Sequence, residues 1–293
     1  MHPSIVQAAI PVVVLALVCC PDTSTAQGPW QPKPPPDIKI PKPEVHLVII
    51  RLQDSPESGG GSVADTAGLG SVVAYANRVY EGVGFKLIFD RQRDFVKLGS
   101  DELNRDSPDD VAATAAAAPY YPSRVPVFVR SKSNGGGWSS RTANHVMMPE
   151  FQKSGGCRGF NVALLAHELG HFFNLEHTFP GVVGDFGSSH CGFSGDAPRD
   201  AERWSCQDGR SPATAFDGDG LYDTAPDPGI EVFSACDPPA SRDFECVHVR
   251  YTIRPPRDNI MSYYGSTMPT FVHLLSLGQK ERVRIARIGR GIP

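Results

Sequence analysis

The stretch HELGHFFNLEH, residues 167–177, decides the fold of this chain. His167 and His171 have the spacing that puts two side chains on one face of a helix, where both imidazoles can bind one metal ion. His177 can join them only if the helix ends near Asn174 and the chain turns back. Three neutral imidazoles leave one position of a tetrahedral zinc open, as in catalytic sites. Glu168 then places a carboxylate where it can take a proton from zinc-bound water.

The segments around this stretch predict an α+β fold. Runs rich in Val, Ile and Leu indicate strands at 44–52, 85–89, 125–129 and 143–148. Apolar residues at helical spacing indicate helices at 64–80 and 276–287, and an alanine-rich piece within 101–121 could form a short helix. We therefore expect one twisted mixed sheet with a backing helix and an active-site helix.

The beginning of the chain has the pattern of a secretory signal. An apolar run over 5–20, too short for a membrane span, is followed by small and polar residues, which predicts a signal peptide over 1–26. A lipoprotein signal using Cys19 or Cys20 is the weaker alternative. A proline-rich linker over 27–43 precedes the domain expected at 44–293, with an upper part at 44–177 and a lower part at 178–293.

The cysteines also favour an exported protein. Of the seven, five lie beyond the signal segment: Cys157, Cys191, Cys206, Cys236 and Cys246. Four of these fall within 178–258, a region with few secondary-structure signals, which predicts a loop-rich C-terminal subdomain stapled by disulfides. Cys157 is the candidate for the odd cysteine, and the pairing of the others stays open.

Charge excludes one class of partner. The net charge is −4, and the modest basic run at 280–290 fits a solvated helix face, so nucleic acid is not expected. We expect a secreted monomer whose partners are protein or peptide substrates, without membrane attachment after signal cleavage.

The longer stretch HELGHFFNLEHTF resembles the metzincin zinc proteases, and within them the pappalysin (cytophagalysin or ulilysin-like) family. The segments GDGLYDTAP (218–226), NIMSY (259–263) and GQKER (278–282) are similar to further motifs of that family. The resemblance implies that Met261 forms an apolar floor beneath the metal and that Tyr263 steadies the oxyanion. Asn174 stands where the family has glycine, a change that the left-handed conformation tolerates.

A calcium site is a further candidate. Asp217, Asp219 and Asp223 are hard carboxylates close in sequence, and relatives of this type bind calcium near the cleft. The spacing departs from the EF-hand pattern at Leu221, and a solvated acidic turn explains the same residues equally well.

The predicted function is a secreted zinc metalloendopeptidase, a hydrolase in which Glu168 assists the attack of zinc-bound water on a peptide bond. Relatives that cut beside Lys or Arg have an acidic residue shortly after the Met261 segment. The segment 265–268 carries none, so the resemblance implies a preference for uncharged over basic substrate side chains. The strand at 143–148 could pair with an extended substrate. Two alternatives stay open: an exported non-catalytic binding protein on a metzincin scaffold, and a zinc amidase acting on cell-wall peptides.

Overall fold

The computed structural model describes part of the compact unit formed by Pro41–Pro293. The described residues are 42–54, 62, 64–105, 108–131, 137–139, 142–150, 162–179, 219–225, 227, 242–246, 249–253, 256–262 and 273–293, with backbone alone for 242–246 and 249–253. The predicted signal peptide, most of the predicted linker, Asp217, Tyr263 and the cysteine side chains lie outside this description. Their predictions therefore stay predictions.

A sheet of five parallel strands forms the centre of the unit. Its strands are β1 (Glu44–Gln53), β2 (Lys86–Ile88), β3 (Phe95–Gly99), β4 (Val125–Val129) and β5 (Val146–Met148). β4 and then β5 follow β1 on one side, while β2 and β3 share its other edge. In the described ranges, antiparallel pairing at this sheet is limited to the bridge between Trp138 and Met147. The five strands themselves are parallel, so the mixed character expected of the sheet is represented, among the described residues, by this bridge.

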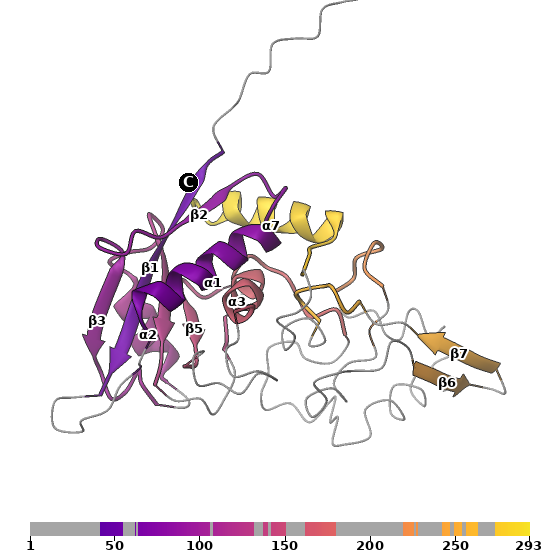
Figure 1. Cartoon of the computed structure of the whole chain (residues 1–293), viewed down its shortest axis with the longest axis horizontal. Helices are drawn as coiled ribbons and strands as arrows, with labels where there is room; N and C mark the ends of the chain where they lie inside the picture. Colours follow the sequence, from indigo (N-terminus) through magenta and orange to yellow (C-terminus); the bar gives the residue numbers. More distant parts are fainter. Residues whose placement is uncertain are drawn as a thin grey trace, which may run out of the picture. The chain divides into compact units, whose positions relative to one another are not determined.

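Helices cover both faces of the sheet (Figure 1). These are α1 (Thr66–Val79), α2 (Asp110–Ala117) and α3 (Leu164–Phe172). Leu47 and Ile49 of β1 pack in one apolar cluster with α1 and α3, whereas Val48 and Ile50 pack in another with α2. Successive side chains of a strand point to opposite faces, so β1 is buried on both. This explains its almost unbroken apolar sequence, which is typical of parallel sheets.

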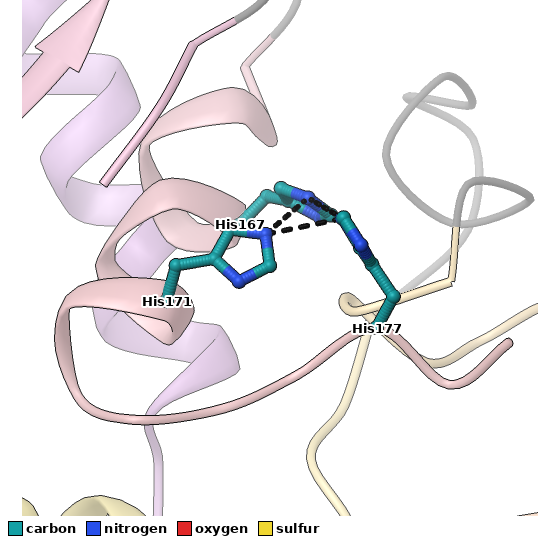
Figure 2. A group of neighbouring side chains, drawn as sticks. All are labelled: His167, His171 and His177. Carbon is teal, nitrogen blue, oxygen red and sulfur yellow. Dashed lines mark hydrogen bonds between the residues drawn. The ribbon is translucent and has the colours of Figure 1, made fainter. Parts of the chain in front are cut away.

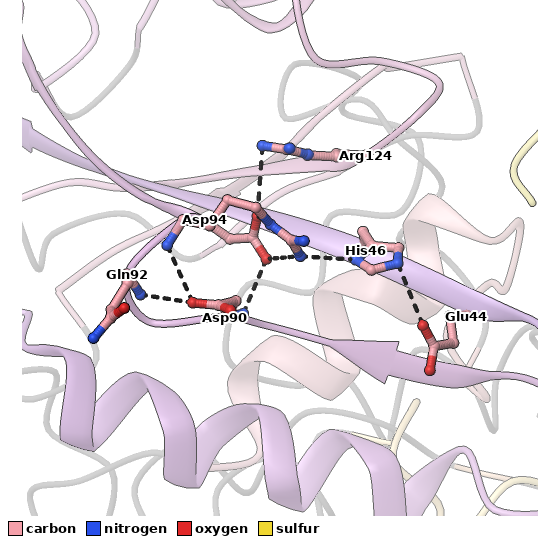
Figure 3. A network of polar contacts seen from close by, with 7 residues as sticks. Glu44, His46, Asp90, Gln92, Asp94 and Arg124 are labelled. Atoms are coloured by element: carbon pink, nitrogen blue, oxygen red, sulfur yellow. Dashed lines mark hydrogen bonds and ion pairs between the residues drawn. The ribbon is translucent and has the colours of Figure 1, made fainter.

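Asp94 lies between the two short strands that pair in turn with one edge of β1, and its side chain is fully buried. β2 pairs with the first part of β1 and β3 with the second part. Between them, the carboxylate of Asp94 accepts hydrogen bonds from the Arg93 guanidinium at 2.9 and 3.0 Å and from the Asp90 amide at 2.9 Å, while Arg124 lies 3.5 Å away (Figure 3). A buried carboxylate requires such partners. Asp94 therefore holds the junction between the two short strands.

The C-terminal helix α7 (Leu277–Gly289) packs beside the α1–β2 connection. Ser276 caps it in a capping box with Gln279, at the predicted start of the helix. Arg284 donates to the carbonyl of Val83 at 3.1 Å, and the guanidinium of Arg290 lies 4.2 Å from the ring centroid of Phe172. α7 thus reaches the active-site helix from the end of the chain.

One antiparallel hairpin corrects the expectation that 178–258 has little regular structure. Its strands are β6 (Arg242–Cys246) and β7 (Val249–Ile253). A two-residue connection such as this one is common in hairpins. Across the described part of the chain, the structure contains no helix long and apolar enough for a transmembrane span.

Candidate metal centre

The active-site helix α3 ends where the histidine spacing requires it to end. Its last residue is Phe172, and Asn174 adopts a left-handed conformation with φ of 66°. The amide of Leu175 then donates to the carbonyl of Gly170 at 2.8 Å, which closes the turn. After glycine, Asn is among the residues that adopt this conformation most readily. The predicted helix end near Asn174 is confirmed.

This turn brings the three histidines together (Figure 2). The Nε2 atoms of His167, His171 and His177 lie 3.1 to 3.2 Å from one another. Metal–nitrogen bonds of about 2.0–2.1 Å in tetrahedral geometry separate the nitrogens by about 3.3–3.4 Å, close to this spacing. Among the residues that the structure describes, these three histidines are the one group arranged to hold a metal ion.

Backbone carbonyls set the orientation of two of the rings. The Nδ1 of His167 lies 2.7 Å from the carbonyl oxygen of Ile260, and the Nδ1 of His171 lies 2.9 Å from that of Leu175. An imidazole that donates through Nδ1 presents an unprotonated Nε2, the form that binds a metal. Burial lowers the pKa of His167 to about 3 and also lowers the pKa of His171, which keeps both rings neutral. The donor set therefore fits a metal ion.

The segment around Met261 packs beneath the active-site helix. Met261 is fully buried, and a Cβ added to Gly170 would come within 3.0 Å of its sulfur. The amide of Met261 donates to Asn259 Oδ1 at 2.9 Å, and its carbonyl accepts from the amide of Thr178. The carbonyl of Ile260, the residue before Met261, orients the ring of His167. This turn therefore contacts α3 through its backbone as well as through the Met261 side chain.

A buried polar network ties this turn to α7. Asn259 Nδ2 donates to Gln279 Oε1 at 2.9 Å, and Gln279 Nε2 donates to Asp219 Oδ2 at 3.0 Å. All three side chains are buried. Their hydrogen bonds satisfy polar groups that would otherwise destabilise the fold. Sequence reasoning missed Asn259 and Gln279, because only the fold brings their segments together.

The acidic segment serves the start of α7. Asp223 accepts hydrogen bonds from the Ser276 hydroxyl at 2.9 Å and from the Gly278 amide at 2.8 Å. Asp219 accepts from the Leu221 amide and from Gln279. Asp223 thus accepts hydrogen bonds at the N-terminus of α7, a position that stabilises a carboxylate. In the described residues, the two carboxylates are thus bonded to the chain itself, and calcium binding with Asp217 stays an untested prediction.

Glu168 is buried and follows His167 directly in helix α3. It is 3% exposed, and burial raises its pKa to about 8, an effect that the charge of Arg130 partly offsets. Its Oε2 has no hydrogen-bond partner among the described residues. A cation between the histidines would lower the pKa of Glu168, since an opposite charge favours the carboxylate.

Residues after the third histidine add support that the motif did not indicate. The ring of Phe179 stacks on His177 with centroids 4.7 Å apart. Thr178 donates through its hydroxyl to Asp227 at 2.5 Å, and Asp227 is fully buried. Both contacts restrict the chain that carries His177. The predicted oxyanion residue Tyr263 lies outside the described residues.

Comparison with known proteins supports the fold. No family model and no curated protein matches the sequence. Among solved structures, mature mirolysin of Tannerella forsythia in complex with a cleaved peptide is similar with a TM-score of 0.51 and 12% identity, covering 83% of this chain and 90% of that one. A promirolysin mutant of the same organism gives a TM-score of 0.52 at 12% identity, covering 83% and 80%. At this identity the likeness concerns the fold alone.

Proposed function

We propose that this chain is a secreted zinc-dependent endopeptidase. The observation that supports the proposal most strongly is the convergence of the Nε2 atoms of three histidines, two of them on the helix that also carries the buried carboxyl of Glu168. The fold likeness to a protein that holds a cleaved peptide agrees with it. The apolar N-terminal run supports secretion, and the pappalysin-like motifs support that family.

The chain's own residues account for the proton steps. Zinc, when bound by His167, His171 and His177, supplies a Lewis acid that polarises water and the scissile carbonyl. Glu168 accepts the proton of the attacking water and returns it to the leaving amine. Its unpartnered Oε2 is the atom proposed to carry that proton. Tyr263 is proposed to donate to the developing oxyanion, as the family resemblance implies.

The edge of the sheet at 137–139, which pairs with no further strand among the described residues, is proposed to bind the extended peptide. Both backbone groups of Trp138 are hydrogen-bonded to Met147, at 2.8 and 2.9 Å. Backbone groups of neighbouring residues on an antiparallel segment point the other way, so those of Gly137 and Ser139 point away from β5. This moves the proposed peptide-pairing edge from 143–148 to 137–139. Added strands bind through such groups with little dependence on side chains.

Proteolysis by zinc-loaded protein tests the proposal. We expect the wild type to cleave casein, and Glu168→Ala to reduce the rate by roughly 10² to 10⁴-fold, because a general base contributes on that order. The variant should still bind one zinc, since the three histidines remain. Glu281→Ala is the matched control, because Glu281 lies on the exposed side of α7.

The outcome separates the alternatives. Wild type that binds zinc yet cleaves neither casein nor short peptides refutes the endopeptidase and favours a binding protein. Cleavage of cell-wall peptides without cleavage of proteins indicates the amidase. N-terminal sequencing of exported protein tests the signal: a start after residue 26 supports it.

A further inference from the structure

The segment 137–139 pairs with β5 at the edge of the sheet, and Gly137 lies against Glu168 of α3. Trp138 forms the antiparallel bridge with Met147, and its ring lies 5.2 Å from the ring of His145. This ring packs with the apolar cluster on the α2 side of the sheet. Since neighbouring residues of an extended segment face opposite sides, Gly137 faces the side of α3.

Gly137 directly abuts the side chain of Glu168. A Cβ added to Gly137 would lie 2.5 Å from Glu168 Oε1, 2.6 Å from its Cδ and 2.7 Å from its Cγ. Real Cβ atoms essentially never show contacts under 3.0 Å. All three of these contacts belong to one carboxyl side chain.

Glu168 has little room to yield to such a Cβ. Its side chain is buried, and α3 fixes its backbone between two histidines of the metal centre. Gly70 offers the contrast, because a Cβ there would meet the end of the exposed Arg91 side chain, which can swing into solvent. The absence of a side chain at 137 thus matters for the position of one particular carboxylate.

We propose that Gly137 is a positioning residue for Glu168: its bare backbone forms the wall against which the carboxylate rests beside the three histidines. This rests on the proposed function of Glu168. Oε1 of Glu168 lies against the backbone of Gly137, whereas its Oε2 has no hydrogen-bond partner in the described part of the chain. A side chain at 137 would push the carboxylate away from the proton that it has to take.

A thermal-unfolding comparison on the metal-free protein tests the contact itself. Gly137→Ala should lower the Tm by roughly 3–10 °C in the wild-type background, the range expected for overpacking in a domain of this size. In the Glu168→Ala background the space is empty, so Gly137→Ala should leave the Tm nearly unchanged. Gly99→Ala is the control, because a Cβ at Gly99 meets nothing within 4 Å. Equal losses of Tm in both backgrounds overturn the proposal.

Peptide cleavage by the zinc-loaded variants tests the positioning. Gly137→Ala should reduce kcat/KM by roughly 10²-fold with zinc content unchanged, the cost expected of a misplaced catalytic group. Glu168→Asp shortens the side chain and so relieves the contact with a Cβ at position 137. The loss of kcat/KM that Glu168→Asp causes should therefore be far smaller in the Gly137→Ala background than in the wild-type background. Independent, multiplicative losses overturn the proposal. If the wild type itself cleaves nothing, the proposed function fails, while the Tm comparison still decides whether Gly137 sets the position of Glu168.

Discussion

Gly170→Ala is expected to destabilise the protein although it lies in a helix. In an exposed helix interior, replacing glycine by alanine stabilises by about 1 kcal/mol, because alanine loses less backbone entropy. At Gly170, however, the new methyl group would come within 3.0 Å of Met261 Sδ and 3.2 Å from its Cε. Packing against the methionine opposes the gain in helix propensity.

The size of the clash decides the sign. Overpacking a filled core costs typically about 1–3 kcal/mol. The upper end applies here, because Met261 is fully buried and its backbone is held by Asn259 and Thr178. After the propensity gain, a net loss of about 2 kcal/mol remains, which lowers the Tm by about 4–8 °C in a domain of this size.

The substitution should also weaken metal binding. Movement of Met261 displaces the neighbouring carbonyl of Ile260, which accepts from His167 Nδ1 at 2.7 Å. Loss of a partner that orients a metal-binding histidine typically reduces metal affinity by about 10 to 100-fold. A zinc titration against a competing chelator measures this effect separately from the Tm.

Gly70→Ala is the matched control for the helix. It lies inside α1, and the side chain that it would meet, Arg91, is exposed and can move. We expect it to leave the Tm unchanged or to raise it. The reasoning is refuted if Gly170→Ala is as stable as the wild type, or if it costs as much in a Met261→Ala background, where the sulfur is gone.

Two further predictions concern supports away from the rings. Burial alone would raise the pKa of Asp94, but its hydrogen bonds from Arg93 and Asp90 and the nearby guanidinium charges lower it below 3.8. The stabilisation by the Asp94 carboxylate is therefore fully present above that pH and is lost as the pH falls through the folded pKa. Urea unfolding should show Asp94→Asn to be less stable than the wild type by about 1–3 kcal/mol at pH 7, with this difference closing below pH 3.8. A difference in stability that does not change with pH contradicts this prediction. Asp227→Ala removes the acceptor of the Thr178 hydroxyl beside His177, and we expect zinc affinity to fall by about tenfold in a chelator competition. An unchanged zinc affinity would show that the hydrogen bond between Thr178 and Asp227 is not needed to position His177.

The elements that sequence patterns located are those specified by local signals. The strand at 125–129 has the predicted bounds, and Ser276 caps the last helix as its pattern indicates. β3 was missed, because its residues Phe95–Gly99 are only partly buried and their strand character comes from pairing with the second half of β1. A short edge strand of this kind depends on tertiary contact more than on propensity.

The same distinction applies to the metal centre. Its ligands lie in one helix and one turn, so their spacing alone predicted that they converge. The contact of Gly137 with Glu168 and the hydrogen bond between Asn259 and Gln279 could not be predicted locally, because each joins segments far apart in sequence. Asp219 and Asp223 have contacts that their spacing did not predict: the start of α7 and Gln279 use their carboxylates as acceptors, while calcium binding stays a prediction.

The arrangement of the rings depends on backbone that the histidine motif does not contain. The motif supplies three Nε2 atoms, but carbonyls of Leu175 and Ile260 fix the orientation of two of the rings. One carbonyl depends on the left-handed turn at Asn174, and the other on the Met261 turn that Asn259 and Gln279 hold. Carbonyls are present whatever the side chains are, so many sequences can build this site once the two turns form.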